Sequence, residues 1–165
     1  MTKKLYSAVL AGTAALAVGL GATSANAATT SANATAEIVQ AITITEDEVL
    51  NFGVIVPAGA LSTVDITAGG IVTCGAGLTC SGSAVPGAFT ATGSDGYDVD
   101  ISVDASTSLT SGANSMTVNN LAPSAATATL TGGTTTFTVG GTLNVGANQV
   151  AGVYSGNYNV SVDYQ

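Results

Sequence analysis

Apolar and polar residues alternate along most of this chain, and a period of two places successive side chains on opposite faces of a β-strand. The alternation is complete over residues 97–104, where every second residue is apolar. Later in the chain, apolar residues occupy odd positions over 137–145 and then even positions over 150–164. We therefore expect two half-buried strands there, separated by a turn at residues 146–149.

A second alternating segment lies near the N-terminus. Its apolar residues fall on even positions and are Ala32, Ala34, Ala36, Ile38, Ile42 and Ile44. Two interpretations stay open. The segment is the first strand of the domain's own sheet, following a frayed tail, or it divides into a detachable strand over 28–39 and an intrinsic strand over 42–44. The adjacent carboxylates Glu46, Asp47 and Glu48 break the alternation, so we expect a solvated turn there.

Short alternating runs separated by turn residues make up the rest of the chain. Gly-rich sequences at residues 69–70, 93–96 and 132–133 favour tight turns between strands. The pair Gly140 and Gly141 lies between strand residues, where we expect a β-bulge. No segment has a convincing helical period of 3.6. About nine to ten short strands of this kind predict an all-β domain, a sandwich of two antiparallel sheets.

The start of the chain has a different composition. Lys3 and Lys4 precede an apolar run over residues 5–20, and small residues follow up to Ala27. This is typical of a secretory signal peptide cleaved after Ala27. A membrane anchor is the weaker interpretation, because the run is short, rich in Ala and Gly, and has no basic residue after it. The expected organisation is a signal peptide (1–27), an N-terminal extension (28–40) and one β-sandwich domain (41–165).

Signal cleavage would leave an unusually acidic chain. Both basic residues lie in the signal peptide, so its removal changes the net charge from −8 to −10 and leaves no Lys, Arg or His. Such a surface repels nucleic acid and anionic membranes, and we expect neither as a partner. Ser-His and Cys-His nucleophiles, Schiff bases and imidazole metal sites are excluded as well. We therefore expect no catalytic residue, no cofactor and no enzyme activity.

Two cysteines, Cys74 and Cys80, lie in the sequence CGAGLTC. Export to an oxidising compartment favours a disulfide between them. So short a loop is expected to stabilise the fold by only about 2 kcal/mol. A redox pair is less consistent with the spacing, and a zinc site would need two more ligands.

Four carboxylates, on Asp95, Asp98, Asp100 and Asp104, form the one acidic cluster with candidate chemistry. Calcium binds several oxygen ligands, so weak calcium binding is one interpretation. However, outward residues of a strand are about 7 Å apart, which suits a solvated face better than a metal cage. Paired acids for glycoside hydrolysis would need an aromatic cleft, and the chain has no Trp.

Four stretches of sequence resemble a known family. They are LNFG at 50–53, FTATGSDGY at 89–97, FTVGGTLNV at 137–145 and GVYSGNYNVSVDYQ at 152–165. Together they are similar to a widespread, uncharacterised family of secreted bacterial domains, related to spore coat protein U and more distantly to chaperone-usher pilins. The resemblance covers residues 36–165. It implies a pilin-like, immunoglobulin-like sandwich that lacks its last strand. A periplasmic chaperone, and later the N-terminal extension of a neighbouring subunit, would fill the gap.

The resemblance also implies which residues would take part. The acceptor edge would be the final strand, with Tyr154, Tyr158, Val160, Val162 and Tyr164. The donor would lie in residues 28–39, with Ala32, Ala34, Ala36 and Ile38 facing the groove, and residues 38–44 are an alternative register. Two features depart from the pilin pattern. The cysteines close a local loop, whereas pilins join two neighbouring strands, and the donor is mostly Ala, which buries little apolar area.

The sequence thus predicts a structural subunit of a bacterial surface fibre (a fimbria) or coat, assembled by strand complementation. Its expected partners are copies of itself or homologous subunits, with a periplasmic chaperone in transit to the cell surface. We expect no membrane insertion after signal cleavage. The alternative is a monomeric extracellular binding module, an adhesin or glycan-binding domain.

Overall fold

The computed structural model describes residues 27–165, and every regular element in that range is a β-strand. Twelve strands form in this range, which confirms the predicted all-β fold of short antiparallel strands, although nine to ten strands were expected. They are β1 (Thr43–Glu48), β2 (Val54–Val56), β3 (Ser62–Ile66), β4 (Val72–Cys74), β5 (Thr79–Ser81), β6 (Gly87–Thr92), β7 (Asp98–Val103), β8 (Ser106–Ser111), β9 (Asn114–Pro123), β10 (Thr127–Thr129), β11 (Thr134–Val145) and β12 (Val160–Tyr164). Across residues 27–165 there is no helix long and apolar enough to cross a membrane.

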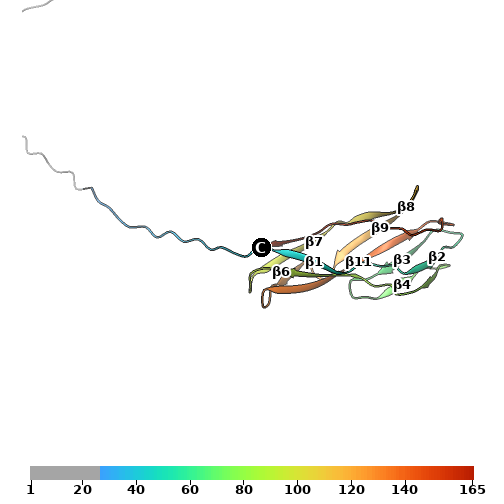
Figure 1. Cartoon of the computed structure of the whole chain (residues 1–165), viewed down its shortest axis with the longest axis horizontal. Coiled ribbons are helices and arrows are strands. Elements are labelled where there is room, and N and C mark those ends of the chain that lie inside the picture. The colour runs from blue at the N-terminus through green and yellow to red at the C-terminus, as the bar shows by residue number, and fades with distance from the viewer. Residues whose placement is uncertain (1–26) are drawn as a thin grey trace, which may run out of the picture. The chain divides into compact units, whose positions relative to one another are not determined.

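The largest sheet has seven strands and is built on β11 (Figure 1). Val139 of β11 pairs with Gly87 of β6 and with Pro123 of β9, so β6 and β9 lie on opposite edges of β11. The pairing of β11 with β6 ends at Val139, and the same edge of β11 then pairs with β3, with Leu143 opposite Val64. The pairing with β9 shifts register between Gly140 and Thr142, where Asn120 and Leu121 of β9 lie opposite Gly141 alone. The extra residue therefore belongs to β9, where Asn120 has a positive φ of 53°, and not to the glycine pair, where the bulge was predicted. β1, β4 and β8 extend this sheet outside β6, β3 and β9.

The second sheet has three strands in the order β10-β7-β12, and a separate pair is formed by β2 and β5. β12 pairs antiparallel with β7, with Val160 opposite Val103 and Tyr164 opposite Val99. The other edge of β12 has no strand partner in the part of the chain that the structure describes. The same is true of β1, which pairs only with β6 among the described strands. Each sheet therefore ends in an unpaired strand edge.

The two sheets enclose one apolar core. Val99 and Ile101 of β7 are buried while Asp98 and Asp100 are exposed, as the alternation predicts. The other core residues come mainly from the seven-stranded sheet and include Val64, Ile66, Phe89, Ala91, Val118, Phe137, Val139, Leu143 and Val145. The rings of Phe89 and Phe137 stack with centroids 5.4 Å apart. Burying each large apolar side chain contributes about 1.5–3 kcal/mol, so this core is the main support of the sandwich.

The chain before the sandwich is a separate unit. The chain divides into two units after Ala36, and the described part of the first, residues 27–36, is exposed and contains no strand. The long N-terminal alternation therefore does not give one continuous strand, because β1 begins only at Thr43. The predicted signal peptide lies almost wholly outside the described residues.

The predicted turn at Glu46, Asp47 and Glu48 is wrong, because all three residues belong to β1. Glu46 pairs with Phe89 of β6, and a register shift follows between Glu46 and Glu48. Every residue of β1 is exposed, so the carboxylates keep their contact with water while the backbone pairs. Thr90 also donates a hydrogen bond from Oγ1 to Asp47 Oδ2, over 2.6 Å.

The predicted disulfide between Cys74 and Cys80 forms. It joins β4, which pairs with β3 in the seven-stranded sheet, to β5, which pairs with β2. The loop that contains the second cysteine thus includes a paired strand. The bond is a short cross-link, but it ties the β2-β5 pair to the larger sheet.

We expect a Cys74→Ser/Cys80→Ser double variant to lose about 2 kcal/mol of unfolding free energy, because a short loop constrains the unfolded chain only modestly. The loss is measured by urea denaturation. Hydrogen exchange should rise in β2 and β5 and stay slow in β11, which the core supports. Equal acceleration in β11 would contradict a local role for the disulfide.

Candidate functional site: a groove between two unpaired strand edges

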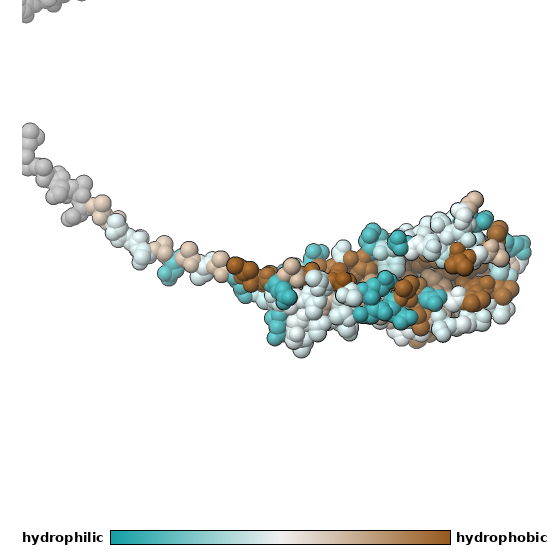
Figure 2. All heavy atoms as spheres, in the orientation of Figure 1, coloured by the Kyte–Doolittle hydropathy of each residue, from teal (hydrophilic) through white to brown (hydrophobic). Residues whose placement is uncertain are grey.

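A continuous groove lies between two segments of the sandwich domain. We call residues 44–57 its first wall and residues 149–160 its second wall. One hollow of about 560 Å³ begins at Ile44 and Val160, and a second of about 650 Å³ extends to Pro57 and Gln149. The two hollows adjoin and together form the groove, because they share the lining residues Val49, Leu50, Phe52, Leu109, Ser155 and Gly156. In Figure 2, apolar side chains surround a hollow in this domain.

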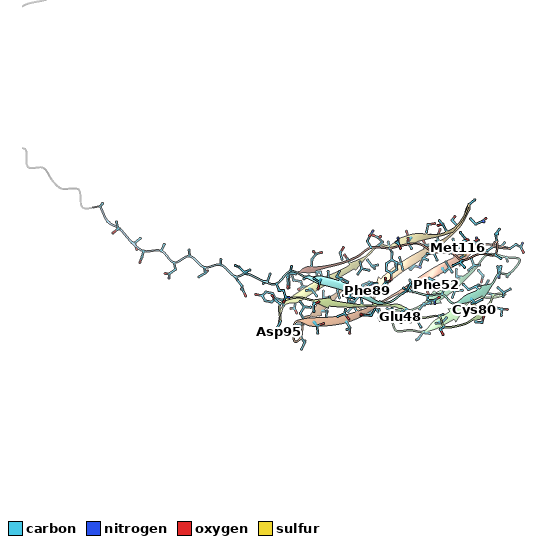
Figure 3. All side chains as sticks on the ribbon, viewed as in Figure 1. Glu48, Phe52, Cys80, Phe89, Asp95 and Met116 are labelled. Carbon is cyan, nitrogen blue, oxygen red and sulfur yellow. A yellow bond between two sulfur atoms is a disulfide. The ribbon has the colours of Figure 1, made fainter. Side chains whose placement is uncertain are left out.

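The floor of the groove is the inner face of the seven-stranded sheet. Leu109 of β8, Met116 of β9 and Leu143 of β11 line the second hollow, and Phe89 of β6 lines the first. Phe52 contributes to both, and Figure 3 shows Phe89, Phe52 and Met116 along the domain. The alternation that directs these residues inward thus leaves part of the core without a covering layer.

Large apolar side chains at the rim of the groove are also exposed to solvent. Val49 and Val54 of the first wall are 63% and 62% exposed, and Val150 and Val153 of the second wall are 55% and 89% exposed. Leaving apolar surface in water costs about 25 cal/mol for each Å² that a partner could cover. Clustered exposure of this kind around a groove is typical of an interaction site.

The second wall is only partly a strand. The predicted final strand over residues 154–164 forms only from Val160, so Tyr154 and Tyr158 lie outside β12. Ser155 exchanges two backbone hydrogen bonds with Thr110 of β8. Gly156 permits this close approach, because a Cβ there would collide with the carbonyl oxygen of Ser108. The chain around Ser155 therefore pairs with β8 and does not extend the pairing of β12 with β7.

Backbone groups of the second wall remain free to bind. Among residues 27–165, the N–H groups of Gly156, Asn157 and Tyr158 donate no hydrogen bond. β12 continues the wall with its unpaired edge, and β1 begins the opposite wall with another. An added strand could therefore pair with backbone on either side while its side chains meet the apolar floor.

Tyr158 connects the second wall to the floor. Its ring meets Phe89 edge-on, with centroids 6.3 Å apart, and its hydroxyl lies against Gly87, where a Cβ would be only 2.6 Å away. The hydroxyl is buried and has no hydrogen-bond partner among the described residues. Burial raises the pKa of Tyr158 to about 12, and the carboxylate of Glu46 adds to the rise.

The four aspartates weighed as calcium ligands each hold a local structure instead. Asp95 accepts hydrogen bonds from the backbone of Gly132 and Gly133. Asp98 accepts one from Thr129, Asp100 one from Gln165, and Asp104 two from Asn159. No group of three His, Cys, Asp or Glu residues within the described chain could hold a metal ion. These carboxylates fix turns and strand ends.

Of the remaining predicted site residues, Val160 lines the first hollow, Val162 and Tyr164 line neither hollow, and the proposed donor residues lie outside the strands. Val162 of β12 is buried in the core, and Tyr164 is half-buried with its hydroxyl bonded to Gln40 and Ser94. The proposed donor residues belong to no strand and are all exposed, namely Ala32, Ala34, Ala36 and Ile38. The first wall was not predicted. Its signal was the alternation of Leu50, Phe52 and Val54, which does not reveal that this segment faces an open groove.

Tyr158→Phe tests whether the buried hydroxyl lacks a partner. The change should leave the unfolding free energy at pH 7 unchanged or slightly higher, because no hydrogen bond is lost. The folded-state pKa lies above the unfolded value of 10.0. The neutral phenol of Tyr158 therefore contributes stability that is complete below pH 10 and is lost as the pH rises towards 12.

Urea denaturation between pH 7 and 12 should thus show a steeper alkaline decline for the wild type than for the variant. Tyr97, whose pKa is raised by its hydrogen bond to Glu37, is present in both proteins and cancels. A loss of more than about 1 kcal/mol at pH 7 would mean that the hydroxyl has a partner.

Comparison with known proteins identifies one family. Residues 42–164 match the family described as Domain of unknown function (DUF4402). The matched range begins just before β1 and ends with β12, so it contains both walls of the groove. No curated protein and no solved structure matches the chain significantly. The chain belongs to the DUF4402 family.

Proposed function

We propose that this protein is an exported structural subunit of a bacterial surface fibre or coat, in which residues 28–39 of one copy fill the groove of another. The observation that carries the proposal is the apolar groove, which has unpaired backbone along both walls and an open apolar floor. A periplasmic chaperone covers the same groove during export. The resemblance to pilin-like domains supports the same assembly route.

Strand addition accounts for binding without specialised side chains. Twelve extended residues span about 40 Å, a length comparable with a wall of fourteen residues that bends on its way along the domain. Each backbone hydrogen bond formed contributes about 0.5–1.5 kcal/mol. Several such bonds to the two walls would hold a neighbour's segment, and its alternate side chains would set the register.

Three of the four donor residues that would face the groove have small side chains, and the fourth has a large one. Ala32, Ala34 and Ala36 would lie over the floor, and Ile38 is the one large apolar residue that shares their face. Ile38 is 95% exposed in the chain itself, so docking would remove most of its surface from water.

Charge does not prevent a second copy from occupying the groove. Glu37 is the one charged residue of the donor segment 28–39, and Glu46 is the one charged residue lining the groove. The remaining carboxylates make two approaching copies repel at long range, and salt screens this repulsion beyond about 10 Å at 0.1 M. Assembly therefore depends on apolar burial and backbone pairing, and ionic strength affects mainly its rate.

Deletion of residues 28–36 from the secreted protein tests the assembly. We expect the full mature chain to elute as oligomers and to form filaments in electron micrographs, and the deletion variant to elute as a monomer with an empty groove. A synthetic peptide of residues 28–41 should then bind the deletion variant and raise its melting temperature. The matched control peptide carries Asp at positions 34 and 36, where a charge would be buried.

The same experiment separates the fibre subunit from a monomeric binding module. A mature chain that remains a stable monomer, unaffected by the deletion, would contradict strand donation. So would equal binding of the native peptide and the Asp-substituted peptide.

Filament growth should also be faster at 150 mM than at 10 mM NaCl, since screening reduces the repulsion between acidic copies. Light scattering after dilution from denaturant measures the rate. Growth that slows with added salt would mean that attraction between opposite charges drives the association. That result would contradict the interpretation that the acidic surfaces of two copies repel each other.

A further inference from the structure

The N-terminal segment is attached close to the groove that it would fill in another copy. β1 begins at Thr43, and Ile44 already lines the first hollow. A donor attached by so short a connection has an effective concentration in the millimolar range for its own groove. A fibre subunit present at micromolar concentration would therefore fill its own groove first, unless something prevents it.

Residues Glu37–Gln40 are held by three side chains of the sandwich, an arrangement that we call the Gln40 clamp. The hydroxyl of Tyr164 donates to the carbonyl oxygen of Gln40 over 2.7 Å and accepts from the N–H of Ser94 over 2.7 Å. The N–H of Gln40 donates to Ser94 Oγ, also over 2.7 Å. Tyr97 donates its hydroxyl hydrogen to the carboxylate of Glu37. Both backbone groups of Gln40 are thus bonded.

The clamp is supported by rigid neighbours. Tyr164 is held opposite Val99 by the pairing of β12 with β7, and its ring meets that of Tyr97 edge-on with centroids 5.5 Å apart. Gly93 leaves room for the Tyr164 hydroxyl, because a Cβ at this position would collide with it. The hydroxyl therefore lies where both hydrogen bonds can form without rearrangement.

The geometry of a β-hairpin shows how far the N-terminal segment can reach along the first wall with and without the clamp. Were the chain to reverse at residues 41–42, a two-residue turn would place residues 28–39 opposite 44–55, along nearly the whole first wall. With Glu37 and Gln40 held, the last possible two-residue turn is at 35–36, and residue 28 then reaches only residue 43. The clamped segment is too short to enter its own groove.

We propose that the Gln40 clamp prevents each copy from filling its own groove and so commits the N-terminal segment to a second copy. This inference rests on the proposed function, because it assumes that residues 28–39 are the donor and that cleavage follows Ala27. Tyr164 acts here as a positioning residue. It does not need to touch the incoming donor to determine where its own copy's segment is directed.

Tyr164→Phe in the full mature chain tests the clamp. The change keeps the ring and removes both hydrogen bonds of the hydroxyl. We expect monomers in place of filaments, with a roughly tenfold or larger rise in the concentration needed for filament growth, the factor that about one net hydrogen bond provides. Hydrogen exchange of the monomer should show residues 28–39 protected, as a filled groove requires. Thr129→Val is the matched control, because it removes a 2.6 Å hydroxyl hydrogen bond to Asp98 in the same sheet but outside the clamp and the groove.

Three outcomes are decisive. Wild-type and Tyr164→Phe filaments with equal concentration dependence would overturn the clamp and leave strand donation intact. Tyr164→Phe monomers with residues 28–39 unprotected would overturn it as well, since the segment is then not in its own groove. A wild type that never assembles would instead overturn the proposed function.

Two further variants exclude a damaged acceptor. Tyr164→Phe combined with deletion of residues 28–36 should bind the synthetic peptide 28–41 as tightly as the simple deletion variant does. An insertion of about twelve Gly and Ser residues between Ala36 and Glu37 would move residue 28 from opposite residue 43 to opposite residue 55. It should therefore also produce self-filled monomers, because the flexible linker extends the reach past the intact clamp. Filaments of normal stability from the insertion variant would contradict the length argument.

Discussion

The pairing of β11 on both of its edges is the interaction on which the rest of the structure depends. One edge pairs with β6 and then with β3, and the other edge pairs with β9. Few backbone groups of this twelve-residue strand therefore remain unpaired. Its inward residues Phe137, Val139, Leu143 and Val145 supply much of the core. Because the centre is saturated, the free backbone edges occur in the outer strands, among them β1 and β12, which border one end of the groove.

The composition limits how those free edges can be used. Without Lys, Arg or His after residue 27, two copies of the domain cannot form ion pairs with each other, and their ten carboxylates each oppose association at long range. Short-range forces remain, namely backbone hydrogen bonds and apolar burial. The groove provides both at one place, whereas the aspartates of β7 and its flanking turns are occupied with local hydrogen bonds.

The two ends of the groove are held in different ways. At one end, the Cys74–Cys80 bond ties the β2-β5 pair, and with it part of the first wall, to the seven-stranded sheet. At the other, Tyr164 binds Gln40 just before β1 begins. A strand-accepting groove needs such supports, because an uncovered apolar floor would otherwise favour collapse of its walls onto each other. The same support at Gln40 would also set the direction of the N-terminal segment.

Local pattern predicted what depends on neighbouring residues. Alternation identified the buried face of β7 and of β11, and the two cysteines of a short loop predicted the disulfide. The local pattern failed where contacts with distant residues determine whether a segment forms a strand. Glu46, Asp47 and Glu48 form a strand because β6 pairs with them and water still reaches their carboxylates, and Tyr154 and Tyr158 leave the strand because Ser155 bonds to β8.

The sequence by itself therefore determined the all-β class, the acidic surface without basic side chains and most of the inward residues, since each follows from residue type and a period of two. Only the tertiary structure decided which strand edges remain unpaired, where the groove opens, and that Gln40 is held by Ser94 and Tyr164. These features join residues more than fifty positions apart, and no local pattern encodes which distant backbone groups will meet.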